Sequence, residues 1–200
     1  KEWIWERDCL KSYKETRNGM VGSDYSSKLS PWLSSGCLSA VQVYWEIKKY
    51  EEERVANEST YWLFFELLWR EFFRFVSRLN GPKLFWRSGI KELGDIRTKG
   101  DPKTLLRWKE GRTANAFVNA NMIELARTGW MSNRGRQNVA SYLIHELGQD
   151  WLAGAKHFEN LLLDYDPCSN YGNWMYLAGV GNDPRPIRAF NLEKQAEYYD

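Results

Sequence analysis

The sequence predicts an all-α fold made of many helices. Three observations lead to this expectation. Apolar side chains recur at helical spacing in segment after segment, and helix-starting and helix-ending residues bracket those segments. No run alternates apolar and polar residues as a half-buried strand does. A chain of 200 residues is the size of one domain, so we treat residues 1–200 as a single helical domain.

The N-terminal third predicts three helices. Apolar residues at roughly helical spacing indicate a first helix over residues 2–16, followed by a loop rich in Gly, Ser and Asn. The pair Ser30-Pro31 is typical of a helix start, with Ser as the N-cap and Pro at the first helical position, and Gly36 ends this short helix. Ser39 is a further N-cap and predicts a helix over residues 40–56.

The longest apolar segment covers residues 60–79, TYWLFFELLWREFFRFVSRL. It is apolar nearly all round, which predicts a helix at the centre of the domain. The turn residues 80–82, Asn-Gly-Pro, end this helix. Residues 83–103 contain several glycines and a proline, so we expect them to be irregular.

The second half of the chain predicts four more helices. Asp and Asn residues supply N-caps, Gly residues supply the ends, and Asp150 is the clearest N-cap. The predicted helices cover residues 101 or 103 to 109, 117–127, 133–147 and 151–163. We expect residues 164–191 to be turn-rich, without regular structure.

Composition narrows the classes of function. The net charge of +2 excludes a strong overall field that would recruit nucleic acid. Three cysteines without metal-ligand spacing indicate reduced thiols. No apolar run reaches about 18 residues, so no membrane span is expected. Aromatic residues make up 16% of the chain, which indicates either a rigid core or a site for a planar ligand or for electron transfer.

Two polar groups of residues lie in segments that could hold a ligand. Glu66 and Arg70 interrupt the long apolar helix at a spacing that favours an ion pair, and they predict either a structural pair or the polar floor of a cavity beside Trp69. Residues 129–138, GWMSNRGRQN, place two arginines and three amides at a helix start. That arrangement favours an anion such as a pyrophosphate, although an ordinary capped helix start has the same composition.

Several other patterns fall short of a known site. Asp164 and Asp166 are too few carboxylates for an oxygen-ligand metal loop, so we expect no metal, and they could instead pair with Arg136 or with a ligand hydroxyl. His145 lacks the second histidine of a zinc helix. The glycines of residues 179–181 follow no strand, which excludes the dinucleotide-binding fingerprint.

Taken together, these segments resemble the photolyase/cryptochrome family, and the DASH-type cryptochromes most closely. The resemblance is colinear from about Tyr13 to the C-terminus. The motifs that carry it are YKETRNGMVGSDYSSKLSPWLSSGCLS, YWLFFELLWREFF, WKEGRT, TGWMSNRGRQNVASYL, LGQDW and LLLDYDPCSNYGNWMYLAGVGNDP. It implies a helical domain that holds FAD in a U-shaped conformation.

The resemblance also implies which residues hold FAD. Arg136 would pair with Asp164, and Asn170 would face flavin atom N5. The residues implied to bind the cofactor are Tyr13, Ser26, Ser27, Lys28, Leu29, Ser30, Glu66, Arg70, Trp130, Asn133, Arg136, Asp164, Asp166 and Asn170.

The resemblance implies an electron-transfer route as well. Trp174 and Trp151 match the inner two members of the family's tryptophan chain. The outer member would fall at residues 95–99, where this sequence has no tryptophan, and Trp86 is a candidate substitute. Efficient photoreduction of the flavin would therefore require electron transfer through Trp174 and Trp151 without the outer tryptophan.

DNA contact is implied for a further set of residues: Arg17, Trp69, Arg70, Arg134 and Tyr176. Three functions stay open: an FAD-binding module that responds to blue light, a lyase acting on lesions in single-stranded DNA like a DNA photolyase, and a dark flavin redox enzyme. The altered segment 114–119 favours the non-repair module, and binding to single-stranded DNA is expected to be weak.

The family's α/β antenna domain and a terminal helix are not found in the sequence, so a dimer or a fusion partner would cover the surface that the antenna domain covers. The resemblance leaves plastid, mitochondrion and cytoplasm open as compartments.

Overall fold

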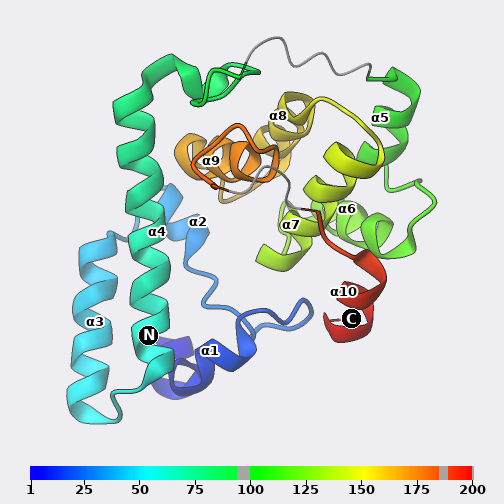
Figure 1. The fold of residues 1–200 in the computed structure, drawn as a ribbon. Helices are drawn as coiled ribbons and strands as arrows, with labels where there is room; N and C mark the ends of the chain where they lie inside the picture. Colours follow the sequence, from blue (N-terminus) through cyan, green and yellow to red (C-terminus); the bar gives the residue numbers. More distant parts are fainter. Residues whose placement is uncertain (94–99, 185–188, 200) are drawn as a thin grey trace.

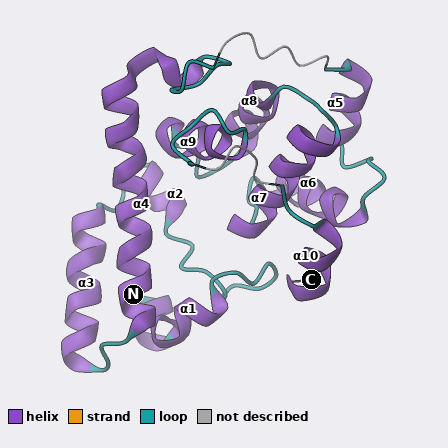
Figure 2. Cartoon of the chain, in the orientation of Figure 1, coloured by secondary structure: helices purple, strands orange, loops and turns teal. Residues whose placement is uncertain are grey.

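The computed structural model describes residues 1–93, 100–184 and 189–199, and every regular element in these ranges is helical (Figures 1 and 2). The predicted all-α fold is therefore confirmed. Within the described ranges, no helix is long and apolar enough to cross a membrane.

The predicted helix over residues 2–16 is wrong as one element. The segment is divided into a π-helix (η1, Glu2–Glu6), a 3₁₀ helix (η2, Cys9–Ser12) and a short α-helix (α1, Tyr13–Thr16). The break falls at Asp8, which has a positive φ of 53°. Its carboxylate accepts hydrogen bonds from Tyr50 and Arg54, so contacts with a distant helix hold the backbone out of a continuous helix.

The next two helices follow the expected caps only in part. Helix α3 (Ala40–Glu53) begins as predicted, because the Ser39 side chain accepts a hydrogen bond from the Gln42 amide in a capping box. Helix α2 (Ser30–Ser34) includes Ser30, so Ser30 is not its N-cap. The Ser30 hydroxyl instead donates to Asp164, which lies 134 residues further along the chain.

Helix α4 (Glu58–Asn80) is longer than predicted and is only partly buried. Asn57 caps it by accepting from two backbone amides, and Leu63, Leu67 and Phe73 are buried. The expectation that this helix lies at the centre of the domain is wrong, because a row of its apolar side chains is exposed. Tyr61, Leu68, Phe72, Phe75 and Leu79 form an exposed stripe at coiled-coil-like spacing. Helix α4 lies near the edge of the described domain, with α3 beside its first half and α9 on another side (Figure 1).

The middle of the chain agrees with the predicted helices to within a few residues. Asp101 and Asp150 are N-caps as expected, and Gly129 ends its helix in the left-handed conformation at φ 67°. The elements are η3 (Gly81–Phe85), α5 (Pro102–Lys109), α6 (Ala116–Thr128), α7 (Asn133–Ser141), η4 (Tyr142–Glu146) and α8 (Trp151–Leu161).

The prediction of an irregular segment over residues 164–191 is wrong. Residues Pro167–Leu177 form helix α9, with Asp166 as N-cap and Pro167 in the first turn. A capping residue followed by proline predicts a helix start here, as it does at Ser30-Pro31. The residues that follow Pro167 include polar residues and glycine, which are poor helix formers and therefore favour the prediction of a loop. Packing of α9 against α4 and α8 stabilises the helix. A last helix, α10 (Leu192–Tyr199), lies near the C-terminus.

Two hydrophobic clusters form the interior. The smaller one joins the N-terminal segment with α2, α3 and the first half of α4 and contains Leu10, Ile47 and Leu63. The larger one joins α5 to α9 and contains Trp108, Met122 and Trp174. A cavity, called the main cavity below, has residues of both clusters in its wall, such as Leu63 and Met131.

Candidate cofactor-binding site

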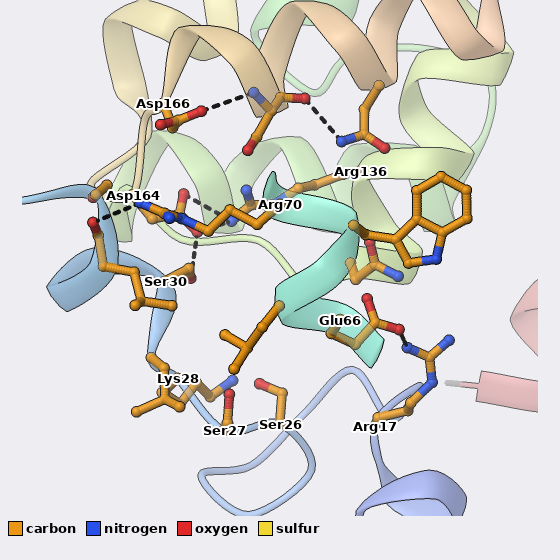
Figure 3. A pocket seen from close by; sticks show the side chains of 18 of the residues that line it. Arg17, Ser26, Ser27, Lys28, Ser30, Glu66, Arg70, Arg136, Asp164 and Asp166 are labelled. Carbon is orange, nitrogen blue, oxygen red and sulfur yellow. Dashed lines mark hydrogen bonds and ion pairs between the residues drawn. The ribbon is translucent and has the colours of Figure 1, made fainter. Parts of the chain in front are cut away.

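A cavity of about 420 Å³ lies between these two clusters. Side chains from the loop before α2, from α4, from the start of α7 and from residues 164–176 all reach it, and Figure 3 shows labelled members of this set around one space. All but one of the residues implied to bind FAD line this cavity. The exception is Asn170, which lines an adjoining cavity of about 120 Å³.

One wall of the cavity is the loop that carries Ser26, Ser27 and Lys28. Lys28 has a positive φ of 53°, a strained conformation for a residue with a side chain. Its ammonium group lies 4.5 Å from the ring centroid of Trp130. Burial, together with the charge of Arg136, lowers the pKa of Lys28, against an opposing effect of Glu124. A strained loop that holds a partly desolvated cation toward a cavity is suited to an anionic ligand.

An ion pair between Arg136 and Asp164 forms another part of the wall. The guanidinium Nη2 lies 3.0 Å and 2.8 Å from the two carboxylate oxygens, and the Asp164 side chain is only 3% exposed. Ser30 donates to the same carboxylate at 2.6 Å. The pairing of Arg136 with Asp164 agrees with the expectation from the resemblance, and it ties α2, α7 and the segment before α9 together.

The polar residues of α4 line the cavity but do not form the expected pair. Glu66 pairs with Arg17 of the N-terminal segment. Arg70 pairs with Glu71 and donates to the Leu33 carbonyl at 3.0 Å. The structural-pair alternative for Glu66 and Arg70 is therefore wrong, because each finds a nearer partner on another segment or at the adjacent position.

The smaller cavity is lined by Asn170 and Trp174 of α9. The Asn170 amide donates to the Ala155 carbonyl at 3.0 Å, which leaves its side-chain oxygen as an acceptor. Trp174 is 3% exposed and lies against α8 at Gly154, where a Cβ atom would be 2.3 Å from the indole ring. Glycine at this position lets the ring approach the helix backbone closely. The two cavities share Arg136, Asp164 and Asp166 in their walls.

Trp151 lines neither of these two cavities. It is buried at the start of α8, and its indole N–H donates to the Arg87 carbonyl at 3.0 Å. Arg87 directly follows the exposed Trp86 in the chain. The expected position of the outer tryptophan, residues 95–99, lies within the segment 94–99, outside the residues that the structure describes.

The residues implied to contact DNA divide into two groups. Arg17, Trp69 and Tyr176 line the main cavity together with Arg70, and Trp69 is 38% exposed. Arg134 does not line it, and instead donates to Gln137 and Asn18.

Sequence reasoning missed several apolar and aromatic residues of the site. Leu33, Leu63, Leu67, Phe73 and Met131 also line the main cavity. The period of the α4 apolar residues predicts that they face the interior, but it cannot distinguish a packed core from a cavity wall. Trp108 lines neither cavity but packs beside the site, with its ring centroid 6.3 Å from that of Trp174.

The fold and the site define a helical domain built around a two-part cavity with several cations in its wall, which suits an extended, anionic cofactor. A family model described as "FAD binding domain of DNA photolyase" matches residues 62–200. The chain belongs to this family and is an FAD-binding domain.

Relatives agree with this assignment. The chain is 58% identical over 198 residues to a cryptochrome DASH of Xenopus laevis and 57% identical over 199 residues to one of Synechocystis, and it covers 38% and 40% of their lengths. It therefore spans about two fifths of the relatives it matches. A cryptochrome DASH of Arabidopsis thaliana, 54% identical over 199 residues and covered to 35% of its length, is described as chloroplastic/mitochondrial.

Solved structures show the same fold. A Synechocystis cryptochrome matches with a TM-score of 0.96 and 56% identity over 99% of this chain and 41% of its own. A class III photolyase of Agrobacterium tumefaciens matches with a TM-score of 0.88 and 33% identity over 100% of this chain and 40% of its own. An archaeal photolyase of Sulfolobus tokodaii, solved with two FAD molecules, has a TM-score of 0.76 and 30% identity over 96% of this chain and 43% of its own.

The residues of the cavity fit FAD. The buried indole N–H of Trp130, in the cavity wall, has no hydrogen-bond partner within the described protein, so it is a donor available to a ligand. Lys28 and the hydroxyls of Ser26 and Ser27 offer the donors that a diphosphate requires. The acceptor oxygen of Asn170 suits an N–H group at the edge of a ring.

Proposed function

We propose that this domain is a flavoprotein module that responds to blue light, with Trp174 as the first electron donor. Bound FAD supplies a flavin that absorbs blue light and accepts electrons. The observation that carries the proposal is the adjoining cavity, which the buried Trp174 and Asn170 line together with Arg136 and Asp164. An easily oxidised indole at this place is positioned for the chemistry of an excited flavin.

The chain's own residues have separate tasks in this proposal. Lys28 and the serines before it bind the diphosphate, and Arg136 and Asp164 orient the polar edge of the ring system. Asn170 holds a proton at flavin atom N5 through its free oxygen. The apolar residues that surround Trp174, such as Phe158 with its ring centroid at 5.1 Å, exclude water from the donor.

Blue-light reduction of the purified, FAD-loaded domain in the presence of a thiol tests this proposal. The absorbance of the oxidised flavin should fall under illumination and stay constant in the dark. Trp174→Phe should slow the loss by at least about tenfold, the factor that corresponds to 1.4 kcal/mol in a barrier.

Trp45→Phe is the matched control, because Trp45 is 64% exposed on α3 and lies outside both cavities. The flavin of this variant should be reduced at the wild-type rate. Equal rates for Trp174→Phe and Trp45→Phe would exclude Trp174 as the donor.

A second candidate function is the binding of lesions in single-stranded DNA. Trp69 and Tyr176 favour it, because both line the main cavity and Trp69 is also exposed to solvent. An aromatic side chain at the entrance of a cavity can stack on an unpaired base, as in other proteins that bind single strands.

A salt series of binding to single-stranded DNA with and without a thymine dimer tests this candidate. Binding that weakens with salt and depends on Trp69 would support it. Absence of binding at low salt would exclude it, while leaving FAD binding and photoreduction unaffected.

A further inference from the structure

Tyr171 of α9 lies between the buried Trp151 and the exposed Phe85. Its ring centroid lies 6.4 Å from that of Trp151 and 4.8 Å from that of Phe85. Its hydroxyl donates to a carboxylate oxygen of Glu159 at 2.7 Å. Tyr171 is only 3% exposed, whereas Glu159 is an exposed residue of α8.

This arrangement suits the removal of an electron together with a proton. A phenol that loses an electron becomes a strong acid, so a nearby base makes the loss favourable. Burial, and then the hydrogen bond to Glu159, raise the pKa of Tyr171, so the resting state is a protonated phenol bound to a carboxylate. Transfer of the proton to Glu159 leaves no new positive charge at the buried ring.

The indoles nearby lack such a base. The N–H of Trp151 donates to the Arg87 carbonyl, and that of Trp108 donates to the Val139 carbonyl at 3.0 Å. An amide carbonyl is too weak a base to take the proton of an oxidised indole. Oxidation of either tryptophan therefore leaves a cation in a buried, apolar place, which is unfavourable.

We propose that Tyr171 is the terminal electron donor of this domain and that Glu159 accepts its proton. The inference rests on the proposed function, because photo-excited oxidised flavin is the oxidant that starts the transfer through Trp174 and Trp151. One electron passes from Tyr171 to the oxidised Trp151, which becomes neutral again. At the same time the O–H bond of Tyr171 breaks, its proton forms a bond to the Glu159 carboxylate, and a neutral tyrosyl radical remains.

Electron paramagnetic resonance of the illuminated, FAD-loaded domain tests the inference. Blue light without added thiol should produce a tyrosyl radical signal, whose splitting changes when the protein is made with ring-deuterated tyrosine. Tyr171→Phe should abolish that signal. Glu159→Gln, which keeps a hydrogen-bond acceptor but cannot take the proton, should remove it as well, and D₂O should slow its formation in the wild type.

Tyr142→Phe is the matched control, since Tyr142 is a buried tyrosine of the same cluster that lines neither cavity and is not in ring contact with Trp151. It should keep the signal. If the flavin is reduced and only a tryptophan radical appears, the inference is overturned and the proposed function stands. If illumination does not reduce the flavin at all, both are overturned.

Discussion

The ion pair between Arg136 and Asp164 leads to the most demanding prediction. In Asp164→Asn the carboxylate is replaced by a neutral amide of the same shape. The Asp164 side chain is 3% exposed and that of Arg136 is 27% exposed, so Arg136 loses its counter-ion at a site with little water. We expect the domain to be destabilised and to bind FAD more weakly.

The size of the effect follows from the burial of the two partners. Removing one partner of a fully buried pair costs about 3–5 kcal/mol. Arg136 keeps some access to water and still donates to the Met131 carbonyl, so we expect a loss of about 2–3 kcal/mol, at or just below the lower limit of that range. With an m-value of about 2 kcal/mol/M, this loss lowers the urea midpoint by about 1–1.5 M.

Urea unfolding followed by far-UV circular dichroism measures the loss, and titration with FAD measures the affinity. Asp166→Asn is the matched control, because Asp166 caps α9 by accepting from the Ser169 amide and Asn is an equally good N-cap. Its effect on unfolding should be a few tenths of a kcal/mol. The reasoning is refuted if Asp164→Asn shifts the urea midpoint no more than Asp166→Asn does.

Three further predictions concern the cofactor loop, the donor and the buried histidine. Lys28→Met should weaken FAD binding about tenfold, as expected for the loss of one charge-assisted hydrogen bond, and an unchanged Kd in a titration would contradict this role. Gly154→Ala should cost about 1–3 kcal/mol and change the fluorescence of Trp174, because the added Cβ meets the indole; the exposed Lys156→Ala on the same helix should change neither. Burial, and to a smaller extent the charge of Lys109, lower the pKa of His157 from 6.5 to about 4. Its neutral form is therefore favoured in the folded state, so the contribution to stability is complete above pH 6.5 and is lost as the pH falls toward 4. In His157→Gln the urea midpoint should depend less on pH over this window. If its dependence on pH is the same as in the wild type, the histidine is not responsible.

The helices were predicted wherever their signals are local. An N-cap such as Ser39, Asp101 or Asp150 contacts amides two or three residues away, so the sequence alone contains both partners of the bond. The same argument explains the correct helix end at Gly129. Helix α9 was missed although Asp166 is a cap of the same kind, because its interior propensity is poor and packing against α4 and α8 decides the outcome.

The site could be predicted only as a set of residues. The family resemblance indicated which residues line the cavity, but not most of their hydrogen-bond and ion-pair partners. A pair with Arg70 along the same helix was one of the two alternatives for Glu66, yet Glu66 pairs with Arg17, 49 positions away. Ser30 was expected to cap α2, yet it donates to Asp164. In both cases, local spacing allows the predicted bond and a distant partner displaces it.

The sequence by itself determined the helical class, the caps that begin most helices, and membership of a family that binds FAD. Each of these depends on residues close together in the chain or on motifs read in order. The tertiary structure alone decided that α4 keeps an exposed apolar stripe, that the cavity has two connected parts, and that Tyr171 lies between Trp151 and Glu159. The physical reason is that buried charges and rings find partners by proximity in the folded chain, which no local pattern records.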